Sequence, residues 1–167
     1  NRFSNFEMNT SHLYNNNIKI PEKTNEDFMW LMGILLGDGH VDLNANKINI
    51  ATHEREDYRD HLIEVINKLF NYTVTEKKER YIIINSKVLC LLFSKIGFAG
   101  NAGSKGVPKW AFSLPESQIL ALLAGYFDSD GHAATYAAAL TSINKPLLQQ
   151  VKALAIQVGY GVSHIMR

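Results

Sequence analysis

The chain has 167 residues, of which 46% are apolar and 20% charged, and its net charge of +1 identifies no partner. This composition is that of a globular protein and excludes a disordered or collagen-like chain. The single cysteine, Cys90, excludes a disulfide framework, and no apolar run approaches the ~20 residues that cross a bilayer. Because the Asn-rich residues 1–23 also lack the apolar core of a secretory peptide, we expect an intracellular protein, in the cytoplasm or nucleoid, with no membrane partner.

Two apolar segments end in the same pattern. Residues 31–40 read LMGILLGDGH and residues 123–132 read LAGYFDSDGH, so Leu, Gly, Asp, Gly and His recur in register. Residues 24–27 and the capping box at 113–116 predict helix starts, and Gly39 and Gly131 suit the left-handed residue that closes a helix. We therefore expect two buried helices of roughly 14 and 17 residues that end at the paired aspartates.

Both segments carry small residues at a spacing of four, which places them on one helix face. In a single segment, ordinary core packing explains such glycines equally well. The duplication favours a symmetric pair of helices in close contact, with these residues at the interface: Gly33, Gly37, Gly125 and Ser129.

The repeat continues beyond the motifs. Residues 41–51 and 133–141 each predict a hairpin, and residues 54–71 and 145–159 each show helical spacing. The first copy goes on through predicted strands at 74–84 and a helix at 86–96, whereas the second copy lacks these parts. We therefore expect an N-terminal extension (1–23), a first half (24–104), and a linker block with a truncated second half (105–167).

A carboxylate at a helix C-terminus is unfavourable by about 0.3–1 kcal/mol, and two such carboxylates at a helix pair also repel each other. An Asp-Gly pair after one helix is usually a plain turn, but two matched copies indicate a shared role. A hard divalent cation such as Mg²⁺ would compensate Asp38 and Asp130 and would attract phosphate, which suits hydrolysis of two phosphodiesters. Asp128 has Leu36 as its counterpart and is expected to be structural.

Both motifs resemble the namesake motif of the LAGLIDADG homing endonucleases, in the two-motif single-chain form. Residues 105–115 and 140–159 are similar to the blocks that flank the second motif in intein-borne members. The resemblance implies an α+β fold of two pseudo-symmetric αββαββα halves that meet at a central pair of motif helices, with hairpins forming a DNA-binding saddle and the second half incomplete. It also implies a site-specific DNA endonuclease that makes metal-dependent double-strand breaks with short 3′ overhangs in a long asymmetric target.

The same resemblance assigns roles to residues. Asp38 and Asp130 would be catalytic and bind Mg²⁺ or Mn²⁺, helped by the carbonyls of Gly37 and Ser129. Lys105 would be the catalytic cation, with Lys109 as the close competitor. The single-chain form implies a monomer that binds double-stranded DNA. An intein origin would place the splicing domain outside this chain, and a free-standing intron-encoded enzyme remains the alternative.

The charge is concentrated between the motifs, where residues 74–110 hold seven basic against two acidic side chains. Basic residues of this kind contact phosphates, and polar hairpin residues contact base edges. The second hairpin is rich in alanine and offers few such groups, so direct readout there should be weak. The candidate DNA contacts are His40, Asn44, Asn46, Lys47, Asn49, Lys77, Lys78, Arg80, Lys109, His132, Tyr136 and Thr141.

Two alternatives stay open. A relative of the same fold that binds nucleic acid without cutting it, such as an RNA maturase or a transcription regulator, is favoured by the Ala-rich hairpin and disfavoured by the retained aspartates. In the second alternative, the two motif helices form only a fusion or dimer interface, and the aspartates are simply the last residues of these helices.

Overall fold

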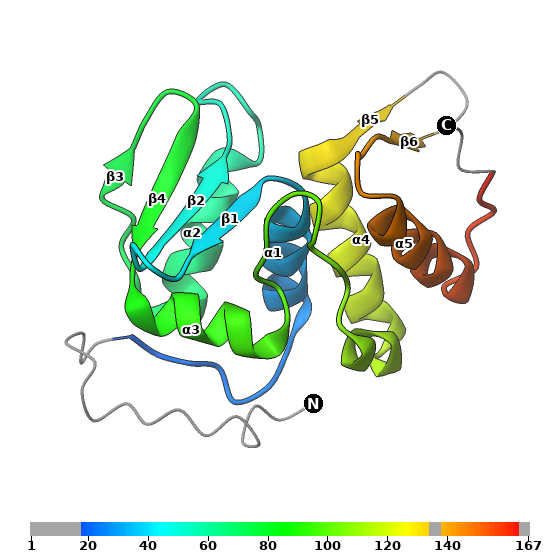
Figure 1. The fold of residues 1–167 in the computed structure, drawn as a ribbon, viewed down its shortest axis with the longest axis horizontal. Helices are drawn as coiled ribbons and strands as arrows, with labels where there is room; N and C mark the ends of the chain where they lie inside the picture. The colour runs from blue at the N-terminus through cyan, green and yellow to red at the C-terminus, as the bar shows by residue number, and fades with distance from the viewer. Residues whose placement is uncertain (1–17, 134–137, 164–167) are drawn as a thin grey trace.

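The computed structural model describes residues 18–133 and 138–163. Most of the expected N-terminal extension (residues 1–17), the turn of the second hairpin with Tyr136, and residues 164–167 lie outside the described part. Two helices lie side by side at the centre, α1 (Glu26–Gly37) and α4 (Glu116–Asp130), and they share the most extensive contact between any two elements (Figure 1).

The first half has the predicted element order. It continues from α1 with β1 (Gly39–Asp42), β2 (Lys47–Ala51), α2 (Arg59–Phe70), β3 (Glu76–Lys77), β4 (Tyr81–Asn85) and α3 (Lys87–Ile96). The four strands form an antiparallel sheet in the order β1-β2-β4-β3. One face of this sheet is buried against the helices, because Ile48 and Ile50 of β2 and Ile82 and Ile84 of β4 are at most 1% exposed.

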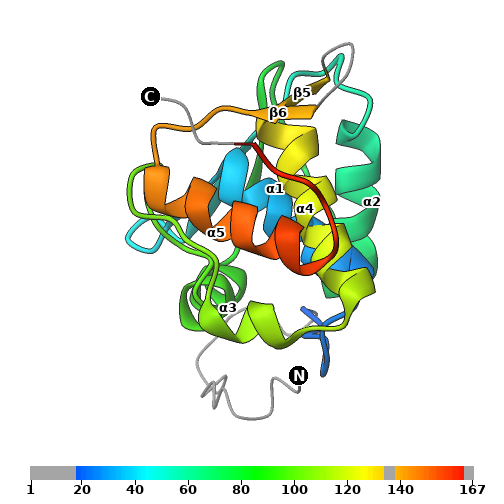
Figure 2. The same cartoon turned by 90° about the vertical axis from the view of Figure 1, so that its right-hand side faces the viewer.

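The second half repeats the first part of this order. A short helix of 3₁₀ type (Lys109–Ser113) precedes α4, and α4 leads directly into β5 (Gly131–Ala133). β5 pairs with β6 (Ala138–Leu140), and α5 (Lys145–Gln157) then packs on α4 (Figure 2). The helix–hairpin–helix order predicted for this half is therefore confirmed. None of the described helices is long and apolar enough to span a membrane.

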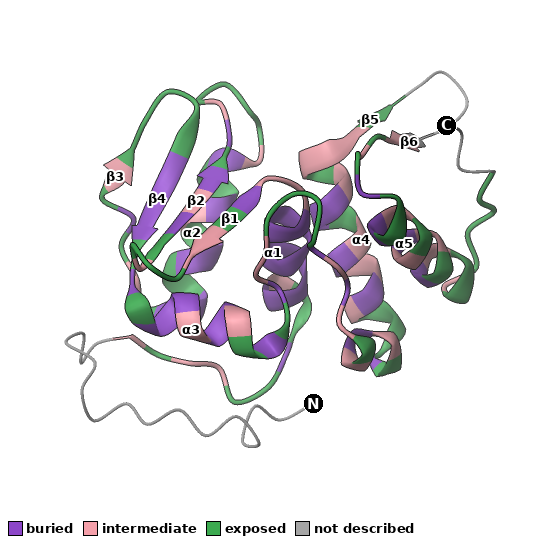
Figure 3. Ribbon diagram, in the orientation of Figure 1, coloured by how far each residue is buried: buried purple, intermediate pink, exposed green. Residues whose placement is uncertain are grey.

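Buried residues concentrate along α1, on the inner face of the sheet and on the inner sides of the helices (Figure 3). Residues 28–36 of α1 are all buried, as expected for a helix that is apolar nearly all round. The core they form also includes Leu147, Val151 and Leu154 of α5, so one core continues through both halves. The fold is thus a mixed α+β arrangement around a central helix pair.

Two details of the helix ends were predicted wrongly. Ser113 does not cap α4, because it lies in the preceding 3₁₀ helix, and α4 begins after Pro115 with no side-chain cap. The glycines after the aspartates are not left-handed: Gly131 has φ −94° and ψ 157°, and Gly39 is not among the residues with positive φ. At both places the chain passes directly from a helix into a strand. The glycine is needed for space, since a Cβ at Gly39 would lie 2.8 Å from the Leu35 carbonyl oxygen.

Asn25 does cap α1, within the segment predicted for this role. Its side-chain oxygen accepts a hydrogen bond from the backbone nitrogen of Phe28 at 2.8 Å. Asn and Asp are favoured at this position because they satisfy a backbone donor at the start of the helix.

Candidate active site

The contact between α1 and α4 rests on glycines. A Cβ at Gly33 would lie 2.5 Å from the backbone nitrogen of Tyr126, and a Cβ at Gly125 would overlap the carbonyl oxygen of Trp30. The backbones of the two helices therefore approach more closely than any side chain would allow. This approach brings the C-terminal ends of the two helices together.

Asp38 and Asp130 lie at these adjoining ends. Asp38 is the residue that caps α1, and Asp130 is the last residue of α4. A Cβ at Gly37 would overlap the Ser129 hydroxyl and would lie 3.3 Å from the carboxyl carbon of Asp130. Both carboxylates are partly exposed, so they remain open to a ligand.

The surroundings of both carboxylates favour their neutral forms. Burial, followed by the negative charges of Asp130 and Glu56, raises the pKa of Asp38 to about 7, against the opposing effects of Lys105 and the Tyr58 hydroxyl. Burial likewise raises the pKa of Asp130, and the nearby Tyr126 hydroxyl and the charge of Lys105 oppose it. A nearby cation would stabilise the charged forms of two such carboxylates.

Lys105 supplies a positive charge at this place. Its side chain is buried, and its Nζ donates to the carbonyl oxygens of Gly37 at 3.0 Å and Leu36 at 3.3 Å. These carbonyls form the C-terminal end of α1, where a positive charge is favourable. Burial lowers the pKa of Lys105, while Asp130 and Asp38 oppose that effect. Lys109, the alternative candidate, is exposed at the start of the 3₁₀ helix.

The donors at this site are chemically suited to a hard divalent cation. Among the described residues, His, Cys, Asp and Glu side chains form no group of three that could hold a metal ion. The site thus offers two carboxylates, to which water and phosphate oxygens would be added around a hard cation. The Gly37 carbonyl accepts from Lys105 and still has a second lone pair for a cation.

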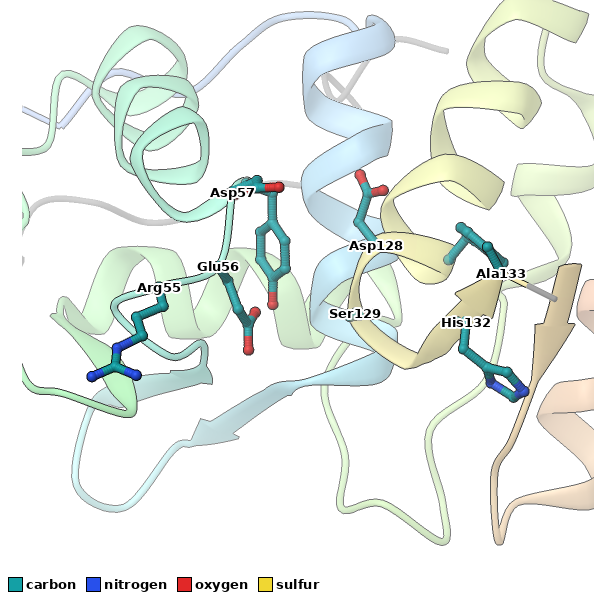
Figure 4. Close-up of a pocket in the computed structure, with 10 residues that line it drawn as sticks. Arg55, Glu56, Asp57, Asp128, Ser129, His132 and Ala133 are labelled. Carbon is teal, nitrogen blue, oxygen red and sulfur yellow. The ribbon is translucent and has the colours of Figure 1, made fainter. Parts of the chain in front are cut away.

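A cleft borders the site on the α2 side. It lies between residues 55–58 and the segment that runs from the end of α4 into β5, and Glu56, Asp57, Asp128 and His132 line it (Figure 4). The Tyr58 hydroxyl lies 3.4 Å from Oδ2 of Asp38, to which it donates a long hydrogen bond.

Asp128 has a structural partner, in agreement with the role expected for it. Its Oδ2 accepts a hydrogen bond of 2.7 Å from Nε1 of Trp30. The indole also packs against His61 and Tyr58, with ring centroids at 4.8 Å and 6.4 Å. These contacts fix the end of α4 relative to α2.

The candidate base contacts of the first hairpin occupy its open face and its turn. His40 is exposed on β1 opposite Asn49 of β2, and Lys47 follows the same side of β2. Asn44 and Asn46 lie in the turn, where Asp42 accepts from the Asn44 backbone and Asn46 has a φ of 54°.

The basic candidates of the β3–β4 hairpin surround its turn, where Lys77, Lys78 and Arg80 are all exposed. In the second half, His132 and Thr141 are exposed on either side of the undescribed turn.

Several residues that shape the site left no signal in the sequence. Arg59 is buried, and its guanidinium donates to the carbonyls of Thr52, Lys78 and Glu79 at 2.5–3.0 Å. Its partners are backbone groups, so no charge pattern indicates them. The partners of Trp30 and of the buried Asn144 lie 98 and about 40 positions away, beyond the reach of any local motif.

One protein family and several solved structures are similar to this chain. The LAGLIDADG-like domain family matches residues 117–162, which contain the second motif and α5. Residues 117–162 are therefore a LAGLIDADG-like domain. The fold of the chain is similar to that of I-DmoI in complex with DNA and Mn, with a TM-score of 0.59 and 15% identity over 80% of this chain and 78% of that one. A mesophilic variant of the homing endonuclease I-DmoI gives the same TM-score over 73% of its chain.

Curated relatives match this chain over short parts of their own length. The iron-sulfur cluster assembly SufBD family protein ML0593 of Mycobacterium leprae is 28% identical over 94% of this chain, which spans 18% of that protein. Reverse gyrase of Methanocaldococcus jannaschii is 37% identical over 68% of this chain, which spans 6% of that protein. The chain therefore spans less than a fifth of either relative.

Proposed function

We propose that this chain is a site-specific DNA endonuclease that depends on Mg²⁺ or Mn²⁺ and makes double-strand breaks with short 3′ overhangs in a long asymmetric target. The observation that carries the proposal is the meeting of Asp38, Asp130 and the buried ammonium of Lys105 at the adjoining ends of α1 and α4. A hard cation at the two carboxylates would polarise water and neutralise charge on the scissile phosphate.

The side chains themselves have separate roles in this proposal. Asp38 and Asp130, with the carbonyls of Gly37 and Ser129, would hold the cation. Lys105 stabilises the negative charge that develops on the phosphate, since its Nζ is already fixed at the end of α1, which Asp38 directly follows in the chain. The Tyr58 hydroxyl orients Asp38 through its hydrogen bond.

The sheet of the first half is the proposed DNA-binding surface. Its inner face is buried, while the other face and the two hairpin turns present His40, Lys47, Asn49, Lys78 and Arg80 to solvent. Exposed cations and amides on one surface suit phosphate and base-edge contacts in the major groove. The similarity to a fold that is solved in complex with DNA supports this assignment.

The chain's relatives support an origin as the endonuclease domain of an intein. Their names share no activity, since they include an iron-sulfur assembly protein, a reverse gyrase, a replication factor C small subunit and DNA polymerases. Each matches this chain over 6–18% of its length, as expected for an element inserted into unrelated hosts. A monomer that acts on DNA inside the cell completes this proposal.

The experiment that tests the proposal first selects a target. Duplexes that the chain retains from a randomised pool are sequenced, and the enriched sequence is cloned into a plasmid. Metal-dependent cleavage of that plasmid is expected for the parent chain and should be abolished by Asp38→Asn and by Asp130→Asn, while both variants still bind the target. Cleavage at the parent rate in both variants would exclude the assigned site.

The second candidate function is nucleic-acid binding without cleavage. The observation that favours it is the Ala-rich second hairpin, in which β5 and β6 carry His132 as the one charged or ionisable side chain among their described residues. Retention of the selected duplex without cleavage in either Mg²⁺ or Mn²⁺ would support this function.

A further inference from the structure

The loop that carries Lys105 is attached to the second half by a buried asparagine. Asn144, which is 3% exposed, precedes α5 and donates from Nδ2 to the carbonyl oxygens of Lys105 at 2.8 Å and Ala102 at 3.2 Å. Its Oδ1 accepts from the backbone nitrogen of Leu147 at 3.1 Å and so caps α5. One side chain therefore joins the first turn of α5 to the loop.

A second amide on α5 binds the same loop two residues further on. Gln150 accepts from the Val107 backbone nitrogen at 2.8 Å and donates to the Val107 carbonyl at 3.3 Å. A Cβ at Gly106 would lie 3.0 Å from Oε1 of Gln150, so the loop backbone passes directly over this side chain. The main chain is thus held at Lys105 and again at Val107.

The Lys105 side chain leaves this loop in the direction of the other half. Its Nζ reaches the Gly37 and Leu36 carbonyls at the end of α1. Ordering a long lysine side chain costs rotamer entropy, and its ammonium is only as well placed as the backbone from which it extends. The amides of α5 determine that backbone position.

We propose that Asn144 and Gln150 are positioning residues that hold Lys105 at the carboxylate pair, so that the second half of the chain controls a cation serving the end of α1. The proposal rests on the nuclease function proposed above for the role of Lys105. Neither amide contacts the reacting groups in this assignment; both act through the loop.

Substitutions can separate this role from helix capping. Asn144→Asp keeps the acceptor for the Leu147 nitrogen but removes both donors to the loop. Asn25→Asp is the matched control, because Asn25 caps α1 in the same way and is exposed. Gln150→Met removes both bonds to Val107 without adding charge, and Gln149→Met changes an exposed neighbour on the same helix.

The first measurement does not depend on activity. Amine acetylation followed by mass spectrometry compares the labelling rate of Lys105 with that of the exposed Lys109 in each variant. We expect Lys105 to be protected in the parent and in both controls, and to label faster in Asn144→Asp and Gln150→Met, with Lys109 unchanged. If Lys105 stays as protected as in the parent in both test variants, the proposal is overturned.

The second measurement is single-turnover cleavage at saturating target DNA. A misplaced catalytic group costs about 10²-fold in rate, and we expect a loss of this order in both test variants, with DNA affinity close to that of the controls. In a Lys105→Met background, Asn144→Asp should slow cleavage no further; an equal additional loss would show that Asn144 acts elsewhere. If Lys105→Met cleaves at the parent rate, the assigned role of Lys105 fails, and the labelling result alone decides whether the amides hold the lysine.

Discussion

The close approach of α1 and α4 predicts that Gly125→Ala destabilises the protein. A Cβ at this position would overlap the carbonyl oxygen of Trp30, and would lie 2.9 Å from its carbonyl carbon and 3.2 Å from the Ile34 nitrogen. These are backbone atoms of α1, so no side-chain rotation relieves the overlap. Overpacking a core costs about 1–3 kcal/mol and sometimes more, and the better helix propensity of alanine offsets about 1 kcal/mol.

We therefore expect Gly125→Ala to lower the free energy of unfolding by about 2 kcal/mol, which corresponds to roughly 4–8 °C in Tm. Urea unfolding followed by circular dichroism measures the change, at an unaltered m-value. Gly161→Ala is the control, because a Cβ there meets nothing within 4 Å. Should Gly125→Ala unfold at the same urea concentration as the parent or a higher one, the inferred contact between the helix backbones would be incorrect.

Three further predictions concern Arg59, Asp128 and Asp38. Arg59→Met leaves the carbonyls of Thr52, Lys78 and Glu79 without their charged donor and should cost about 2–3 kcal/mol in urea unfolding; an unchanged midpoint would contradict this role. Asp128→Asn keeps an acceptor for the Trp30 indole and should preserve cleavage, whereas Asp128→Ala should cost about 1–2 kcal/mol of stability; loss of cleavage in Asp128→Asn would assign Asp128 to the reaction. Burial raises the pKa of Asp38 from 3.8 to about 7, so the folded metal-free chain binds a proton that the unfolded chain has released, and stability should fall as pH rises between these values. Asp38→Asn should reduce the difference in urea midpoint between about pH 5 and about pH 8, and an undiminished difference would refute the shift.

Periodicity predicted the order of elements because burial imposes it locally. The apolar spacing of α2, with Leu62, Ile66 and Leu69 on one face, follows from contact with a single core. The alternation in β2 has the same origin, since Ile48 and Ile50 face the helices while Asn49 faces away. Such patterns repeat within a few residues and are visible without any knowledge of tertiary contacts.

Helix ends were less predictable, because several local solutions compete there. At the start of α4, the ring of Pro115 keeps the preceding residue out of the helical region, and Leu114 is extended with ψ of 158°, so Ser113 is left in a separate turn. At the ends of α1 and α4, glycine is needed because a Cβ would clash with Leu35 or Phe127, and not because the backbone is left-handed. The residue type was informative at these positions, although its physical reason was different from the expected one.

Among the candidate site residues, too, some could be placed from the sequence and others could not. Asp38 and Asp130 could be paired from the sequence because the duplicated motif implies a symmetric contact. The loop that carries Lys105 depends on Asn144 and Gln150, whose hydrogen bonds to backbone groups span about 40 positions. Backbone partners carry no residue identity, so sequence alone gives no means of finding them.

The attachment of the Lys105 loop to α5 sets a condition for building hybrids of this chain with others of the same fold. Residues 97–108 precede α4, yet Ala102, Lys105 and Val107 among them are hydrogen-bonded to Asn144 and Gln150, which follow it. A hybrid joined immediately before α4 would combine the lysine of one parent with the amides of another. A junction placed at Gly97, where α3 ends, would transfer the loop together with the helix that holds it.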